Sequence, residues 1–204
     1  MERTLQPDFF HAMQQHRLER GSSEYPPKLV ARLEHAAPAE IRAIGNLGLL
    51  ALPKTGLFCS ARCPGHIILT AYDQAARWRD AGRCIISGFH SPVEQECLRI
   101  LLRGTQPIII CPARALPQRI PAEWRTPLAD GRLLILSGFA ATEKRITTEL
   151  ATRRNAFVAA LADEVCFAHI TPGGQSERPT HRLTGWHVPF STLTKPWRTP
   201  QQTR

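Results

Sequence analysis

Short polar loops follow several apolar runs in this chain of 204 residues, and their composition suits phosphate binding. Glycine-rich turns expose backbone N–H groups, a helix N-terminus adds partial positive charge, and arginine grips phosphate with two parallel hydrogen bonds. The candidate phosphate-binding residues are Ser60, Arg62, Gly65, Ser87, Gly88, His90, Ser91, Arg114, Gly173 and Gly174. The sequence therefore predicts an anion-binding site built from loops.

The same loops contain few residues that could carry out acid–base or nucleophilic catalysis. The sequence has no Gly-x-Ser-x-Gly elbow, and its spacing suggests no Ser-His-Asp set. His90 and Glu177 are the acid–base candidates, whereas Glu94 is explained as a helix cap. The sequence favours ligand binding over catalysis, and it indicates no cofactor.

The six cysteines do not form the pattern of a disulfide framework or a metal site. Most of them lie in or beside apolar runs, where a free cysteine behaves as a small buried hydrophobic residue. Cys59 and Cys63 have three residues between them, but no second Cys/His pair stands at ligand spacing to complete a site. We expect six free thiols and no bound metal.

The elements that position these loops are visible as alternating strand and helix patterns. Short apolar runs stand at 57–60, 84–87, 107–111, 133–137, 165–170 and 188–193, and helical patterns occupy most of the gaps. Strands that alternate with helices indicate parallel strands joined by right-handed crossovers. We therefore expect an α/β, Rossmann-like fold with a central, mainly parallel sheet and helices on both faces. In such sheets ligands bind beyond the carboxyl ends of the strands, where the polar loops fall.

Three helices are predicted in detail. The first buries Ile67, Ala71, Ala75 and Trp78 on one face and ends at Gly82. The second has Ser91 as N-cap with a capping box to Glu94, and it buries Val93, Cys97, Leu98 and Leu101. The third spans about 146–163, with Ile146, Leu150, Phe157 and Leu161 directed inward.

The chain divides into three parts on composition. Residues 1–50 are expected to form a short helical extension, with one helix at 39–44. Residues 51–193 form the Rossmann-like domain, and 194–204 form a flexible tail. No apolar run approaches the ~20 residues of a membrane helix, and the N-terminus has no apolar signal core, so we expect a cytoplasmic protein away from membranes.

The charge balance is strongly basic. Lysine and arginine number 26 against 17 acids, for a net charge of +9, and arginine dominates. Arginine binds phosphate through two donors and stacks on bases, so a polyanionic partner such as nucleic acid fits this balance. A basic surface without a partner is the alternative.

Several of these motifs together resemble the DprA/Smf family, DNA-processing protein A. Ser60-Ala61-Arg62 with Gly65 is similar to the family's Gly-Ser-Arg turn, and Ser87-Gly88 begins its Ser-Gly-x-Ala-x-Gly-Ile-Asp motif. Arg154-Asn155 resembles the start of its Arg-Asn-Arg stretch, with Ala156 at the second Arg. Phe89-His90-Ser91-Pro92 replaces the rest of the second motif, and we interpret its terminal acid as missing. The resemblance runs from Tyr25 to Leu193.

The resemblance implies a short relative that holds the Rossmann-like domain. It implies binding of single-stranded DNA in recombination or DNA uptake, contact with RecA, and a homodimer. It adds Arg154 and Asn155 to the phosphate-binding residues. The alternative is a small-nucleotide sensor or a nucleotide phosphoribohydrolase like the LOG enzymes of the same superfamily, because Pro172-Gly173-Gly174 matches the start of their phosphate loop.

Overall fold

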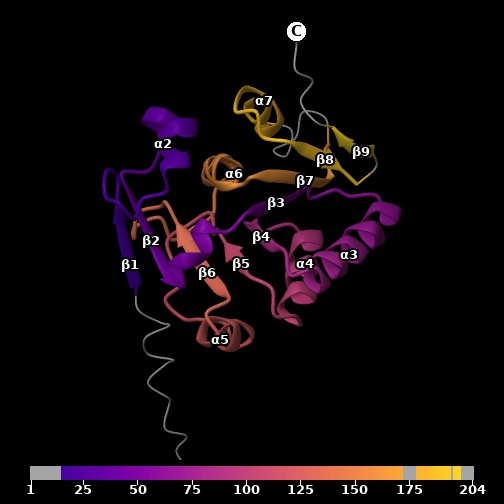
Figure 1. The fold of residues 1–204 in the computed structure, drawn as a ribbon, viewed down its shortest axis with the longest axis horizontal. Helices are drawn as coiled ribbons and strands as arrows, with labels where there is room; N and C mark the ends of the chain where they lie inside the picture. Colours follow the sequence, from indigo (N-terminus) through magenta and orange to yellow (C-terminus); the bar gives the residue numbers. More distant parts are fainter. Residues whose placement is uncertain (1–14, 172–177, 194, 199–204) are drawn as a thin grey trace, which may run out of the picture.

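The computed structural model describes residues 15–171, 178–193 and 195–198, in which nine strands form one sheet. The sheet has the order β1-β2-β6-β5-β4-β3-β7-β8-β9 (Figure 1). The strands are β1 (Gln15–Glu19), β2 (Glu40–Gly45), β3 (Lys54–Cys59), β4 (Cys84–Ser87), β5 (Ile108–Ile110), β6 (Leu133–Ser137), β7 (Glu164–His169), β8 (Phe190–Thr192) and β9 (Lys195–Arg198). The helices are α2 (Pro27–Leu33), α3 (Gly65–Asp80), α4 (Pro92–Leu102), α5 (Ala122–Ala129), α6 (Thr148–Leu161) and α7 (Arg178–Gly185), with 3-10 turns η1 (Glu34–Ala36) and η2 (Leu47–Ala51).

The centre of the sheet is parallel, which confirms the expected fold class. Strands β6, β5, β4, β3, β7 and β8 pair in parallel, whereas β1, β2 and β9 join the sheet antiparallel at its sides. The order runs outward from β3 to β6 in one direction and from β7 to β8 in the other. The direction of winding therefore reverses between β3 and β7, the place where open α/β sheets bind ligands.

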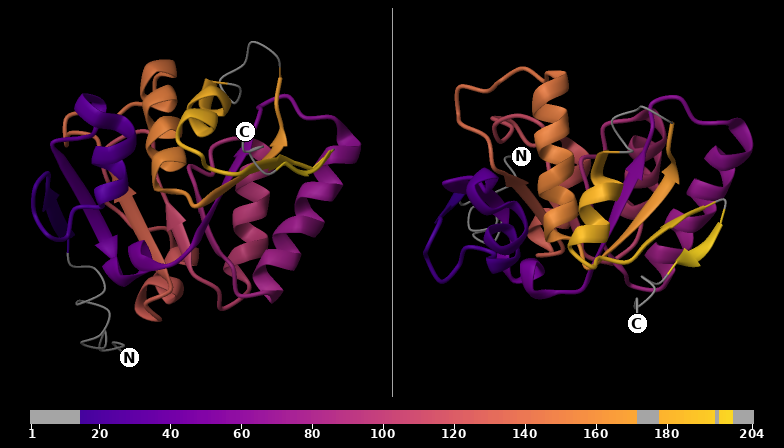
Figure 2. Two further views of the ribbon diagram at one scale, coloured as in Figure 1. Left: turned by 45° about the horizontal axis from the view of Figure 1, so that its top comes forward. Right: turned by 90° about the horizontal axis from the view of Figure 1, so that it is seen from above.

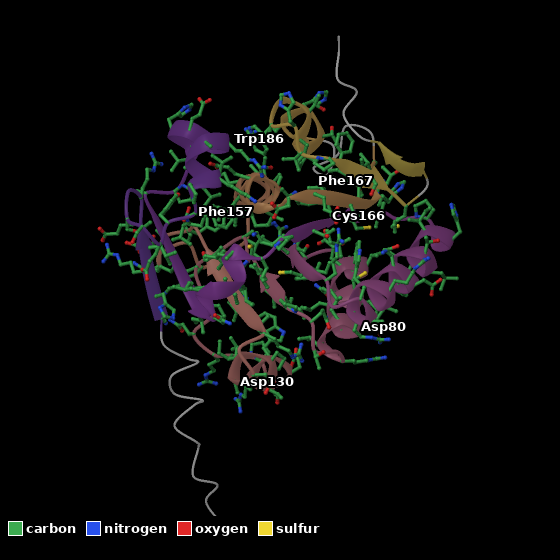
Figure 3. The ribbon with its side chains drawn as sticks, in the orientation of Figure 1. Asp80, Asp130, Phe157, Cys166, Phe167 and Trp186 are labelled. Carbon is green, nitrogen blue, oxygen red and sulfur yellow. The ribbon has the colours of Figure 1, made fainter. Side chains whose placement is uncertain are left out.

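Helices cover both faces of this sheet (Figure 2). On one face α2, α6 and α7 bury Leu29, Phe157 and Leu183 against strand residues that include Phe58 and Phe167. On the other face α3, α4 and α5 bury their apolar residues, among them Ala71, Cys97 and Leu128. In Figure 3 Phe157 and Phe167 lie inside these layers, and Asp80 and Asp130 lie at the periphery. None of the helices in the described ranges is long and apolar enough to cross a membrane.

The detailed helix predictions are confirmed apart from one residue. The four predicted inward positions of α3 are buried, and α4 has both hydrogen bonds of the Ser91–Glu94 capping box. In α6, Leu150, Phe157 and Leu161 are buried. Ile146 is 42% exposed, because it precedes the N-cap Thr147 and lies outside the helix.

The helix expected at 39–44 is wrong, because these residues form β2. Ile41 and Ala43 are buried, while Glu40 and Arg42 alternate with them at half-buried positions. This period of two is the period of a strand with one buried face. Arg17 of β1 and Arg42 of β2 both form ion pairs with Glu40. These ion pairs therefore also hold the antiparallel strands β1 and β2 together. The segment before residue 51 therefore contributes two strands to the main sheet as well as α2.

One carboxylate joins three elements at the opposite, amino-terminal edge of the parallel strands. Asp163, between α6 and β7, pairs with Lys28 of α2 and accepts a 2.9 Å hydrogen bond from the backbone N–H of Lys54 in β3. Partial burial raises the pKa of this carboxyl, but the hydrogen bonds and charges of Lys28 and Lys54 outweigh burial and hold its pKa below the ordinary value.

We expect this network to make the fold sensitive to acid. A carboxyl whose pKa is lower in the folded state contributes stability that is present above its ordinary pKa of 3.8 and lost as the pH falls from there through the lower folded-state pKa. Urea unfolding of the wild type and Asp163→Asn across pH about 6 to about 3 measures the loss, and the variant should lose less on acidification. Asp130→Asn is the control. Parallel pH curves for wild type and Asp163→Asn would contradict the role of Asp163.

Candidate functional site

The loops that carry the predicted site residues meet at the carboxyl edge of the parallel strands. Ser60 follows β3, and its hydroxyl accepts a 2.9 Å hydrogen bond from the backbone N–H of Thr171, which follows β7. Ser87 ends β4 and donates to the backbone O of Leu57 at 2.7 Å. These bonds bring the predicted serines together. Gly173 and Gly174 lie outside the described residues.

A buried carboxylate occupies the space between the ends of β3 and β4. Glu94 is 6% exposed, and its oxygens accept hydrogen bonds from the backbone N–H groups of Cys59 at 2.8 Å, His90 at 2.8 Å and Ser91 at 3.0 Å. These are the kind of convergent N–H groups that the sequence predicted as phosphate donors. The protein therefore holds an anion of its own at this position.

Glu94 also corrects the interpretation of the second family motif. Counted from Ser87, Glu94 stands eighth, at the place of the terminal Asp in Ser-Gly-x-Ala-x-Gly-Ile-Asp. An acid is therefore present at this position, with Glu in place of Asp. It was missed because Glu94 was assigned to the capping box alone. Both roles hold, since one oxygen completes the box while the other reaches β3.

Arg154 of α6 is buried at the same edge and fills the space above Gly88. It is 5% exposed, its Nε donates to Oδ1 of Asn155 at 2.8 Å, and Nη1 donates to the backbone O of Cys111 at 3.4 Å. A Cβ at Gly88 would stand 1.0 Å from Nη1, so a residue without a side chain is required there. Burial lowers the pKa of Arg154, and the negative charge of Glu94 opposes that shift.

Three of the predicted phosphate-binding side chains face solvent around these buried groups. Arg62, His90 and Arg114 are exposed and follow β3, β4 and β5 respectively. Within the described part of the chain, no hydrogen bond or ion pair engages the side chain of Arg62 or Arg114. Gly65 is exposed at the start of α3, and Ser91 is buried as the N-cap of α4. The rim therefore offers the guanidinium groups of Arg62 and Arg114 without a partner among the described residues, while the interior of the edge is filled.

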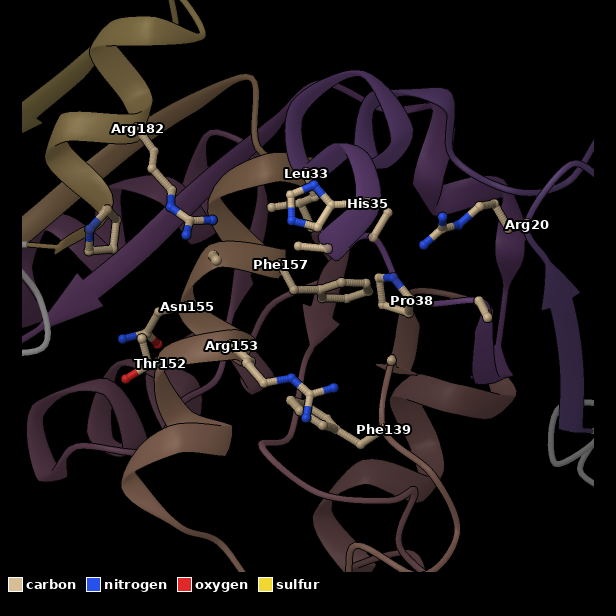
Figure 4. A pocket seen from close by; sticks show the side chains of 16 residues that line it. Arg20, Leu33, His35, Pro38, Phe139, Thr152, Arg153, Asn155, Phe157 and Arg182 are labelled. Carbon is tan, nitrogen blue, oxygen red and sulfur yellow. The ribbon is translucent and has the colours of Figure 1, made fainter.

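A cavity of about 690 Å³ opens next to this edge, on the face covered by α2, α6 and α7. We call it the basic groove (Figure 4). Three arginines line it, Arg20 after β1, Arg153 of α6 and Arg182 of α7, together with His35 of η1, and its described lining includes no aspartate or glutamate. The four side chains come from four elements and surround a single hollow, which suits an anionic ligand.

Arg153 is held in place at the groove by two neighbours. Its guanidinium carbon lies 5.2 Å from the ring centroid of Phe139, and its Nη1 lies 3.3 Å from Oε1 of Glu143. A cation over an aromatic face is attracted by the ring and loses part of its rotational freedom. Asn155, which lines the groove, also accepts the hydrogen bond from buried Arg154. Successive residues of α6 thus connect the groove with the filled edge.

Sequence reasoning found Asn155 in the groove and missed the other polar residues. Arg20 and His35 lie in the segment that was expected to be a separate helical extension, so nothing in the sequence placed them near α6. The sequence feature that could have indicated the groove is Ser137-Gly138-Phe139. This loop directly follows an apolar run, as do the loops that were predicted to bind phosphate. All six cysteines carry free thiols, and the described residues include no cluster of three potential metal ligands.

Comparisons with known proteins point to a single fold. No family model matches the sequence, and no curated protein matches it. DNA processing protein A (DprA) of Streptococcus pneumoniae superposes with a TM-score of 0.72 at 18% identity, over 90% of this chain and 64% of that chain. DprA of Helicobacter pylori, for which a single-stranded DNA binding mode is described, superposes with a TM-score of 0.68 at 18% identity, over 88% and 80% of the two chains. This chain therefore has the fold of DNA processing protein A and spans less than two thirds of the S. pneumoniae chain.

Proposed function

We propose that this chain is a DprA-like DNA-processing protein that binds single-stranded DNA at the basic groove and the adjoining rim. The observation that carries the proposal is the composition of the groove, where Arg20, His35, Arg153 and Arg182 line one cavity without an acidic residue among the described lining. The H. pylori protein of the same fold binds single-stranded DNA, which supports the same class of ligand here.

The chemistry of the site suits a polymer of phosphates better than a single nucleotide. Binding of a mononucleotide at a Rossmann-like edge relies on convergent backbone N–H groups. In this chain Glu94 already accepts three of them, and Arg154 fills the space above Gly88. The cations that remain available, Arg62 and Arg114 at the rim and the groove arginines, are spread over several elements. A strand with repeated phosphates can contact them in succession.

Within this proposal Arg62, Arg114 and the groove arginines contact phosphates, while Arg154 and Asn155 support the site from inside. The serines and Gly88 hold the loops at the edge. Recombination or DNA uptake as the process, RecA as a partner and a homodimer as the assembly are proposals that follow from the family resemblance. Their support is the shared fold.

A binding screen separates single-stranded DNA from a small nucleotide. Oligonucleotides of increasing length and mononucleotides are compared at two salt concentrations by fluorescence anisotropy or calorimetry. We expect affinity to rise with strand length and to fall steeply with salt, because bound counterions are released from the DNA. Saturation by a mononucleotide with weak salt dependence would overturn the proposal and favour a nucleotide sensor or hydrolase.

Arg62→Ala should weaken DNA binding by about 1.5–3 kcal/mol, the value of a hydrogen bond to a charged group. The slope of log affinity against log salt should fall by about one unit. Folding stability should change little, since Arg62 is exposed and has no partner among the described residues. Arg62→Lys should restore binding in part, because lysine lacks the two parallel donors.

The control for Arg62→Ala is Arg125→Ala on α5, an exposed arginine at the far end of the molecule from α7 (Figure 1). Both variants lose one positive charge, so a difference between them reports position rather than net charge. A lower melting temperature with unchanged affinity would instead assign Arg62 to holding the loop.

A further inference from the structure

His35 is held at the basic groove by a turn whose flanks are buried. It lies in η1, between α2 and β2. Leu33 before it and Ala37 after it are buried in the apolar cluster that also contains residues of α2 and α6. The backbone N–H of Ala37 donates to the backbone O of Glu34 at 3.2 Å, which closes the turn around His35. The backbone is therefore fixed, while the side chain of His35 is exposed.

No protein group engages the imidazole in the described part of the chain. Neither a hydrogen bond nor an ion pair involves the side chain of His35 there. The ring lines the same hollow as Arg20, Arg153 and Arg182, and Figure 4 shows it on the groove wall beside Leu33. The ring nitrogens are therefore available to a ligand that enters the groove.

The charged side chains that line the groove with His35 are arginines in the described residues. Arg20 follows β1, Arg153 belongs to α6 and Arg182 belongs to α7. The acids closest along the walls lie outside the lining, since Glu34 precedes His35 and is exposed, and Glu143 pairs with Arg153. A protonated imidazole thus has no counter-charge among the described lining residues until an anion binds.

The helix packed against η1 adds no charge to the groove. Within the described residues, α2 contributes only Leu33 to the lining. Its Arg32 donates to the backbone O of Ala160 at 2.9 Å and of Ala162 at 2.7 Å, and its Lys28 pairs with Asp163. These charges are directed to the end of α6 and not to His35.

We propose that His35 binds a DNA phosphate in its protonated form, so that the basic groove takes up a proton when it binds single-stranded DNA. This role rests on the proposed function, because the DNA supplies the phosphates. A neutral imidazole has one N–H donor, whereas the protonated ring has two and a positive charge. Arginine stays charged throughout, so among the described lining residues His35 is the group that changes charge between about pH 5 and about pH 8.

Binding should therefore strengthen as the pH falls. A phosphate next to the ring favours its charged form, so protonation and DNA binding support each other. A group whose pKa is higher in the complex than in the free protein adds affinity that is fully present below its free-state pKa. That gain is lost as the pH rises through the pKa of the complex. Because the phosphodiesters of DNA stay charged over this range, the change reports the protein.

A pH series with labelled oligothymidylate tests the role of His35. Thymine gains no proton between about pH 5.5 and about pH 8, the range in which histidine titrates, so the bases do not contribute. Fluorescence anisotropy at constant ionic strength gives the affinity at each pH. We expect the wild type to bind about three- to tenfold more tightly at the acidic end, because one unit of pKa difference corresponds to a tenfold change.

Two substitutions fix the charge at position 35. His35→Gln keeps a polar side chain without a titratable group, so it should bind at every pH about as weakly as the wild type does at the alkaline end. His35→Lys is charged throughout and should stay near the tight, acidic limit of the wild type. Melting temperatures should change little, because His35 is exposed and has no partner in the described part of the chain.

His187→Asn is the matched control, since it also removes one exposed histidine. His187 follows α7 outside the groove lining, and its φ of 55° is one that asparagine tolerates. This variant should keep the pH dependence of the wild type. His90 at the rim stays in every variant, so a slope that survives in His35→Gln does not come from His35.

Calorimetry adds a second measurement that does not depend on comparing affinities. Titrations at one pH in two buffers with different ionisation enthalpies report the protons exchanged with the buffer. Proton uptake by His35 should make the observed enthalpy differ between the buffers for the wild type, and this difference should shrink in His35→Gln and His35→Lys.

The possible results separate the role of His35 from the proposed function. Oligothymidylate that fails to bind at every pH would overturn the proposed function and the role of His35 together. Binding whose pH dependence is absent, or is the same in wild type and His35→Gln, would overturn the role of His35 and leave the groove as the DNA site. A slope that both substitutions flatten, at opposite limits of affinity, supports the proposal.

Discussion

Glu94→Ala should destabilise the fold by about 3 kcal/mol or more, because each of three backbone N–H groups left without its acceptor costs roughly 1–3 kcal/mol. The change leaves the backbone N–H groups of Cys59, His90 and Ser91 without their acceptor and removes the negative charge that acts on buried Arg154. It also removes half of the capping box of α4. The free energy of unfolding from urea denaturation, with the fitted slope compared between proteins, measures the loss.

Glu96→Ala is the matched control, because it removes the same side chain from the same helix. Glu96 pairs with Arg99, an exposed arginine three residues further along α4, so its loss should cost about 0–1 kcal/mol. Equal stability of Glu94→Ala and Glu96→Ala would contradict the role of Glu94 as the internal anion of the edge.

Removing two arginines of the basic groove together, as Arg153→Ala/Arg182→Ala, should weaken single-stranded DNA binding by about 3–6 kcal/mol, at about 1.5–3 kcal/mol for each charged contact. The salt slope should fall by about two units. Both side chains are exposed and line the cavity from α6 and α7, so they can reach one strand together. Fluorescence anisotropy with a labelled oligonucleotide at several salt concentrations gives both quantities.

The double variant Arg103→Ala/Arg125→Ala loses the same two charges away from the groove. Arg103 is the exposed C-cap of α4 and Arg125 is exposed on α5. It should bind almost as wild type, apart from a small loss of long-range attraction. Similar losses in the two double variants would show that net charge attracts the DNA and that the groove is not its site.

The sequence correctly located the candidate residues whose position depends on neighbours along the chain, and their phosphate-binding role stays a prediction. Arg62, His90 and Arg114 were chosen because they directly follow apolar runs, and they are exposed after strands β3, β4 and β5. Glu94 was recognised as a cap, since Ser91 and Pro92 stand beside it. Its bond to Cys59, 35 residues earlier, has no local sign in the sequence.

The basic groove depends on contacts between segments far apart. Arg20, His35 and Arg182 belong to segments that come near α6 after β2 pairs with β6, β1 pairs with β2, and α7 packs on the sheet. The period-two burial of Glu40–Gly45 became evident through those pairings, because a six-residue segment is too short for its pattern to exclude a helix.

The sequence by itself determined the parallel α/β core of this protein, the buried faces of α3 and α4 and the excess of arginine. Apolar runs, Ser91 as N-cap and glycine stops act within a few residues, so their effect can be read locally. The tertiary structure alone decided that Glu94 fills the edge, that Arg154 requires Gly88 and that three arginines and His35 share one groove. These arrangements depend on burial and on contacts across many residues, which arise when the sheet assembles and the helices pack upon it.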